Sequence, residues 1–142
     1  MIIMSVDLGL VRTGVAFCDK SEMLATPAGN IEERDENVLA KKIAAMADDR
    51  GAELIVVGYP VNMNGTIGPR AEKCSAIADK IQKYTKSDVV LWDERSTTVS
   101  AYVSLKEGNV KGRKKKGIVD SLAAAIILES YLDYRKNMSK NN

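Results

Sequence analysis

The N-terminal run of residues 2–19 constrains the fold more than any other part of the sequence. Two short apolar segments rich in Ile, Val and Ala flank a polar turn that contains Gly9 and Gly14. Such segments suit the pleated surface of a sheet, and glycine supplies the backbone freedom of a tight bend. The run therefore predicts two strands joined by a turn, with one acid, Asp7, inside the first.

An acid inside an apolar strand needs an explanation. A carboxylate removed from water requires a cation or hydrogen-bond donors to offset its desolvation. Asp7 is therefore either part of a metal site or a side chain that forms the turn, since Asp often bonds its own backbone in turns. Asp7 alone leaves both interpretations open.

The composition limits the classes of protein to consider. The 142 residues, 45% apolar and 28% charged, fit one globular domain. The two cysteines, Cys18 and Cys74, form no paired motif and favour reduced thiols, and no apolar run approaches the ~20 residues of a membrane span. We therefore expect a cytoplasmic protein without a membrane segment, and core positions for both cysteines.

The sequence contains no histidine. This absence excludes Ser–His and Cys–His nucleophilic sites and His-based zinc sites. An enzyme of this sequence would have to use carboxylates, lysines or a bound metal.

The order of the remaining elements predicts an α/β fold. After the first two strands, the pattern predicts the following elements: a strand over 23–31 at an edge of the sheet, a helix capped by Asp35 and ended by Gly51, a buried strand over 53–58, a helix that opens at Pro69, a buried strand over 88–92, a helix to about 107, a basic loop over 108–117, and a last helix from Ile118 to about Arg135. We expect a mixed five-stranded sheet with helices on both faces, formed by residues 1–136, and a frayed tail over 137–142. Ligands in such folds gather at the carboxyl ends of the strands.

Three acids fall where that sheet edge is expected. Asp93 and Glu94 follow the strand over 88–92, and Asp120 lies in the first turn expected for the last helix. Helical spacing points Asp120 toward the sheet, although it could instead only complement the helix dipole. Asp7, Glu94 and Asp120 can therefore converge from three elements. Such a cluster suits one or two Mg²⁺ or Mn²⁺ ions, which prefer oxygen ligands and can bridge substrate phosphates.

A cluster of positive charge precedes Asp120. The chain has a formal net charge of +2, and removing five basic residues in one short segment leaves 2 − 5 = −3. These residues are Lys111, Arg113, Lys114, Lys115 and Lys116. A solvated loop is one interpretation, and a binding segment for a polyanion is the other. Beside a carboxylate cluster, the second interpretation favours metal-dependent hydrolysis of nucleic acid.

Several motifs resemble those of the YqgF/RuvX family. They are Asp7-Leu8-Gly9 with Arg12-Thr13-Gly14, Val57-Gly58-Tyr59-Pro60, Asn62-Met63-Asn64-Gly65-Thr66, Gly68-Pro69-Arg70-Ala71, Asp93-Glu94-Arg95-Ser96-Thr97-Thr98, and the run from Lys116 to Ala124. They follow the family's order from the first strand to the last helix. The family is described as Holliday-junction resolvases or as nucleases that mature the 5′ end of 16S ribosomal RNA, on a ribonuclease H-like fold.

The resemblance implies catalytic and metal-binding roles for Asp7, Glu94 and Asp120. Relatives in the wider fold carry the middle acid after the fourth strand, where this sequence has Gly58, so Asp93 could take the role of Glu94. Substrate contacts are expected at Arg12, Asn62, Asn64, Arg70 and Arg95 and at the five basic residues from Lys111 to Lys116. The asparagines could instead only build a turn, and Arg12 and Arg95 could be ion-pair residues.

Three classes of function remain open at this point. The first is a metal-dependent endonuclease that acts on precursor ribosomal RNA or on branched DNA, as a monomer or a weak homodimer. The second is an actin-like nucleotide-binding domain, since an Asp-x-Gly turn is also a phosphate motif, although this chain has the length of only one such domain. The third is an RNA-binding module without catalysis.

Overall fold

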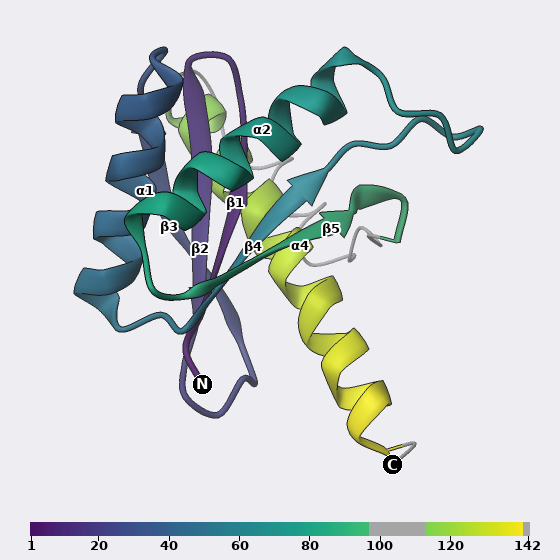
Figure 1. The fold of residues 1–142 in the computed structure, drawn as a ribbon. Coiled ribbons are helices and arrows are strands. Elements are labelled where there is room, and N and C mark those ends of the chain that lie inside the picture. The colour runs from purple at the N-terminus through teal and green to yellow at the C-terminus, as the bar shows by residue number, and fades with distance from the viewer. Residues whose placement is uncertain (97–112, 141–142) are drawn as a thin grey trace.

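The computed structural model describes the backbone of residues 1–96 and 113–140, with side chains over 1–95 and 121–139. Five strands form one sheet in the order β3-β2-β1-β4-β5 (Figure 1). They are β1 (Ile3–Asp7), β2 (Arg12–Cys18), β3 (Ala25–Glu32), β4 (Leu54–Tyr59) and β5 (Asp88–Asp93). The first three strands pair antiparallel, whereas β4 pairs parallel with both β1 and β5. The expected mixed five-stranded sheet is thereby confirmed.

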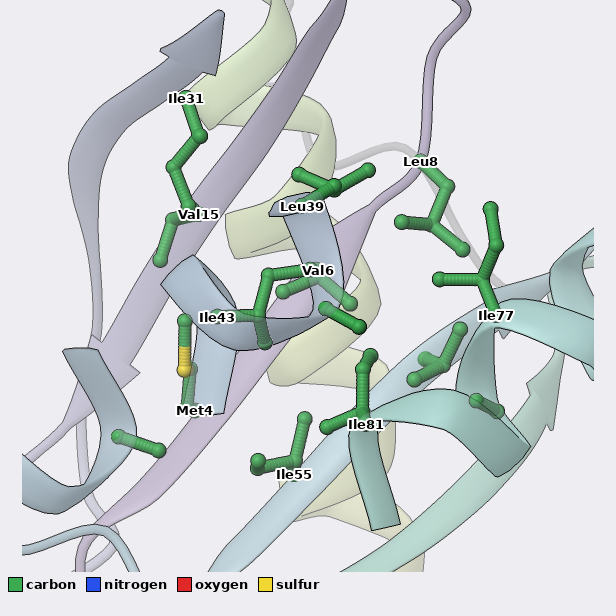
Figure 2. Packing of buried hydrophobic residues seen from close by; sticks show 14 of the residues in the cluster. Met4, Val6, Leu8, Val15, Ile31, Leu39, Ile43, Ile55, Ile77 and Ile81 are labelled. Atoms are coloured by element: carbon green, nitrogen blue, oxygen red, sulfur yellow. The ribbon is translucent and has the colours of Figure 1, made fainter. Parts of the chain in front are cut away.

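Helices cover both faces of this sheet. Helices α1 (Glu36–Arg50) and α2 (Pro69–Tyr84) lie on one face, and α4 (Arg113–Lys140) crosses the other (Figure 1). Strand β1 serves both layers because its side chains alternate: Met4 and Val6 pack under α1 and α2 (Figure 2), whereas Ile3 packs against α4. Among the described residues, no helix is long and apolar enough to cross a membrane.

The helix ends follow the sequence signals. The Asp35 carboxylate accepts a hydrogen bond of 2.9 Å from the Val38 amide, which caps α1. Gly51 ends α1 in the left-handed conformation, with φ of 73°. Pro69 opens α2, where its missing amide proton costs nothing. The expected caps and the core positions of Cys18 and Cys74 are confirmed.

Two expected elements differ in the structure. The last helix begins at Arg113, not at Ile118, and it continues to Lys140. The loop was expected to extend to Gly117, but a single glycine inside a helix costs only about 1 kcal/mol, and Arg and Lys are good helix formers. Residues 113–117 are therefore helical instead of part of a loop. The helix expected to end near 107 and the loop residue Lys111 lie outside the described residues.

Strand β5 is the second difference. Its apolar run predicted burial, but it lies at the edge of the sheet and its residues are partly or fully exposed. Strand β3 occupies the opposite edge, and its pairing with β2 is irregular between Gly14 and Ala16, as expected from the proline in that strand.

Candidate functional site

Asp7 is the last residue of β1 and lies at the carboxyl edge of the parallel strands. Strand alternation puts its half-buried side chain on the same face as Ser5, whose hydroxyl donates a hydrogen bond of 2.6 Å to the Ala124 carbonyl of α4. Asp7 therefore belongs to the α4 side of the sheet.

Glu94 reaches the same place from β5. It opens a short 3₁₀ turn (Glu94–Ser96) directly after that strand. A Cβ atom added to Gly58, at the end of β4, would lie 3.0 Å from Glu94 Oε1 and 2.8 Å from Ile127 Cδ1 of α4. Gly58 therefore leaves the space into which the Glu94 carboxylate folds. From the sequence alone, Gly58 marks only the point where a strand ends without an acid.

Asp7 and Glu94 are neighbours at this edge: Val6 pairs with Val57, so Asp7 ends level with Gly58, and the Glu94 carboxylate lies over Gly58. Burial raises the pKa of Glu94 above its ordinary value, while the charge of Arg70 and the neighbouring Asp7 oppose that rise. Two neighbouring carboxyl groups cannot both stay ionised without a compensating positive charge. A proton, a bound cation or the charge of Arg70 can relieve this repulsion, and two of the three predicted acids are together.

Asp93 has a different environment, although it is the next residue. Its carboxylate accepts hydrogen bonds from Arg95, at 2.7 Å from Nη2 and 3.0 Å from Nε. Its hydrogen bonds with Arg95 lower the pKa of Asp93. Of the two acids after β5, Glu94 lies near Asp7 and Asp93 is held in an exposed ion pair. The interpretation of Arg95 as an ion-pair residue is confirmed.

Asp120 lies in α4, about two turns inside the helix and not in its first turn, because the helix begins at Arg113. Ala124 lies beside Ser5 of β1, and Arg135 lies near the first residue of the chain through Glu22. Helix α4 therefore runs opposite to β1, and its backbone approaches the carboxyl edge at Asp120. The Asp120 side chain is outside the described part, so its convergence stays a prediction. Among the described side chains, no three acids form a metal-binding group.

The loop after β4 builds its own turn. Asn62 Nδ2 donates to Thr66 Oγ1 at 3.0 Å, and Asn64 Oδ1 accepts from the Thr66 amide and hydroxyl. Gly65 has φ of 86°, which favours glycine. The turn interpretation of Asn62 and Asn64 is confirmed, and their contact with a substrate stays a prediction.

Two of the predicted cationic residues, Arg70 and Arg12, border this edge. Arg70, in the first turn of α2, is close enough to lower the pKa of Glu94. Arg12 opens β2 across the turn from Asp7 and is half-buried. The first turn of α4 is formed by four of the predicted basic residues, Arg113, Lys114, Lys115 and Lys116, whose side chains lie outside the described residues.

The fold is shared with nucleases of known structure. The Thermus thermophilus RuvC structure in complex with a Holliday junction substrate matches with a TM-score of 0.59 and 10% identity, over 94% of this chain and 96% of that chain. The fowlpox virus resolvase bound to Holliday junction DNA matches with a TM-score of 0.58 and 12% identity, over 94% and 98%. This likeness defines a ribonuclease H-like fold.

The family follows from the sequence. A family model described as RuvX, Holliday junction resolvase, matches residues 1–134, and this chain belongs to that family. A Geobacillus kaustophilus protein named "Putative pre-16S rRNA nuclease" is 40% identical over 94% of this chain and 98% of its own length. A Halothermothrix orenii protein of the same name is 41% identical, over 97% and 99%.

Proposed function

We propose that this protein is a metal-dependent endonuclease that hydrolyses phosphodiester bonds in structured nucleic acid, with the 5′ end of precursor 16S ribosomal RNA as its substrate. The observation that carries the proposal is the position of Glu94 over Gly58, level with Asp7, at the carboxyl edge of the sheet. Burial makes such an acid pair unfavourable for folding, and groups of this kind cluster at functional sites. Phosphodiester hydrolysis, the chemistry expected for a family described as resolvases, would use such a pair.

The donor set suits a divalent cation. Carboxylate oxygens are the ligands that Mg²⁺ and Mn²⁺ prefer, and a cation would remove the repulsion between Asp7 and Glu94. Asp7 and Glu94 would hold one or two ions, and Asp120 would complete the set. A bound ion supplies an activated water and neutralises charge on the phosphate.

The chain's own cations would bind and orient the substrate. Arg70 lies beside the acid pair and is placed to contact the phosphate next to the cleaved bond. Further from the cleaved bond, Lys111 and the cations in the first turn of α4 would bind phosphates of the substrate backbone. Such binding is favourable because it releases counterions from the nucleic acid. Arg12, Asn62, Asn64 and Arg95 line the rest of this edge.

The relatives favour ribosomal RNA over a DNA junction. The proteins named for pre-16S rRNA are about 40% identical over nearly the whole chain, whereas the structures named for Holliday junctions share only 10–12% identity. An rRNA substrate would place the protein in the cytoplasm. A four-way DNA junction is the second candidate, because the RuvC and fowlpox resolvase structures compared above contain a Holliday junction.

A cleavage assay tests the proposal. Precursor 16S rRNA with its 5′ extension and a four-way DNA junction are each incubated with the protein and Mg²⁺ or Mn²⁺. We expect cleavage of the RNA at its 5′ end, its loss in EDTA, and its loss in Asp7→Asn, which keeps the shape but removes a ligand charge. Cleavage of the junction alone would favour the second candidate. Full activity of Asp7→Asn would contradict the proposal.

A further inference from the structure

A hollow of about 570 Å³ opens at the same edge of the sheet, on the side of α2. The turn after β1 forms one wall with Leu8, Gly9 and Leu10. The first turns of α2 form the other wall, with Pro69, Arg70, Lys73, Cys74 and Ile77. Figure 2 shows Leu8 and Ile77 next to each other at the end of the buried cluster.

The hollow adjoins the acid pair. Arg70 lines it and also acts on Glu94, whose pKa it lowers. Cys74, in its wall, responds to both acids: burial and the charges of Glu94 and Asp7 raise the pKa of the thiol to about 11, against the opposing charge of Arg70. Leu8 and Gly9 in its wall follow Asp7 directly along the chain, so the hollow opens at the edge that carries the acid pair.

The lining combines an apolar floor with a cationic rim. Leu8, Cys74 and Ile77 are buried and form the floor, whereas Leu10 is 77% exposed and stands at the mouth. Arg70 and Lys73 are both exposed, and no acid is among the described lining residues. Such a surface suits a flat apolar group that carries an anion, and it does not suit a metal ion or a free acid.

A nucleotide of a nucleic acid has this chemistry. Its base has apolar faces, and its phosphate can pair with Arg70 and Lys73. A base stacked in a duplex cannot enter, because it must first leave the stack, and unpaired bases do so at the least cost.

We propose that the hollow receives one unstacked base of the nucleotide next to the cleaved bond, with Leu10 against the base and Lys73 on its phosphate. This inference rests on the proposed function and adds a substrate class to it: nucleic acid that is unpaired at the cut. The hollow selects against cleavage within a continuous duplex.

The test uses fluorescence and binding, neither of which needs turnover. The probe is a single-stranded RNA of about 12 nucleotides with 2-aminopurine at one position, scanned along the strand, free or annealed to its complement. Emission of 2-aminopurine rises when the base unstacks, and none of the described lining residues is aromatic, so the hollow would not quench it. We expect a rise at one position of the single strand and about tenfold weaker binding of the duplex.

Two exposed leucines provide a matched comparison. Leu10→Ser should abolish the rise and weaken single-strand binding about fivefold, whereas Leu24→Ser, 67% exposed between β2 and β3, should change neither. Lys73→Ala should weaken binding and Lys83→Ala, in the last turn of α2, should not. Both leucines are exposed, so neither change threatens folding.

The outcomes separate this inference from the proposed function. Equal effects of Leu10→Ser and Leu24→Ser would overturn it and leave the hollow to another occupant, such as a protein side chain. Equal binding of duplex and single strand without any rise would also overturn it. If cleavage of precursor rRNA fails while the Leu10-dependent rise remains, the hollow still binds a base and the proposed function is what fails.

Discussion

Two partly buried glutamates, at opposite ends of the sheet's central strands, differ in how their negative charge is compensated. Glu22, at the amino end of β1, accepts hydrogen bonds from the N-terminal ammonium at 2.9 Å and from Arg135 Nε at 2.7 Å. These cations, Arg135 above all, lower the pKa of Glu22. Glu94, at the carboxyl edge, lies near another acid, and burial raises its pKa.

The two glutamates therefore differ in whether their ionised form favours the folded state. Glu22 ties the last helix to the start of the chain, across 113 residues of sequence, so its ionised form stabilises the fold. The ionised form of Glu94 is disfavoured by burial and opposes folding. A bound ligand can compensate for such a group, so under the proposed function Glu22 serves stability and Glu94 serves chemistry.

The largest expected effect concerns activity. Glu94→Gln should reduce RNA cleavage at least about a hundredfold, since the amide cannot replace a ligand charge. Glu22→Gln, an equal change at the other edge, should leave the cleavage rate per folded molecule unchanged. Initial rates on precursor rRNA in Mg²⁺ measure both. Similar losses in the two variants would mean that the edges do not differ in role.

A smaller effect is expected when Glu94 is displaced but kept. Gly58→Ala introduces a Cβ at 3.0 Å from Glu94 Oε1 and 2.8 Å from Ile127 Cδ1, so one of them must move. We expect about a tenfold loss of cleavage with the fold retained. Gly68→Ala is the control, because the nearest atom to its Cβ is Asn62 Nδ2 at 3.4 Å. A Gly58→Ala protein with full activity would show that the position of Glu94 is unimportant.

A change at Glu22 should lower the stability of the protein. Glu22→Gln removes the charge that holds Arg135 and the N-terminus, and we expect the free energy of unfolding to fall by about 1 kcal/mol. Glu53→Gln, at an exposed position outside these pairs, should change little. Urea unfolding followed by circular dichroism measures both. An unchanged midpoint in Glu22→Gln would contradict the stabilising role.

The ion pair of Glu22 with Arg135 predicts that the stability of the protein depends on pH. The folded pKa of Glu22 lies below its ordinary value of 4.5, so its contribution is complete above that value and is lost as pH falls through the folded pKa. The difference in unfolding free energy between wild type and Glu22→Gln should therefore shrink as the pH drops below 4.5. A difference that stays constant with pH would require another cause.

The sequence predicted most of the fold because its signals were local. Alternating apolar strands, the Asp35 cap and Pro69 at a helix start each depend on a few neighbouring residues. The start of α4 was wrong because the Arg and Lys residues before Gly117 are good helix formers and outweigh its small cost. The burial of β5 was wrong because an apolar run does not reveal which strand becomes the edge.

The candidate site was harder to predict, because it depends on contacts between distant segments. The resemblance indicated Asp7 and Glu94, but only the folded chain separates Glu94 from Asp93, through the bonds of Asp93 to Arg95. Gly58 is important because of where Glu94 folds, which no local pattern encodes. The hollow between Leu10 and Lys73 likewise joins a turn to a helix that is distant in the sequence.

Metal-dependent stability tests the central claim most directly. Urea unfolding of wild type and of Glu94→Gln is measured with EDTA and with Mg²⁺ near ten times its dissociation constant. We predict that Mg²⁺ raises the unfolding free energy of wild type by about 1.4 kcal/mol, and that Glu94→Gln is at least as stable as wild type in EDTA and gains nothing from Mg²⁺. An equal gain in both proteins, or none in wild type, would contradict the assignment of Asp7 and Glu94 as a cation site.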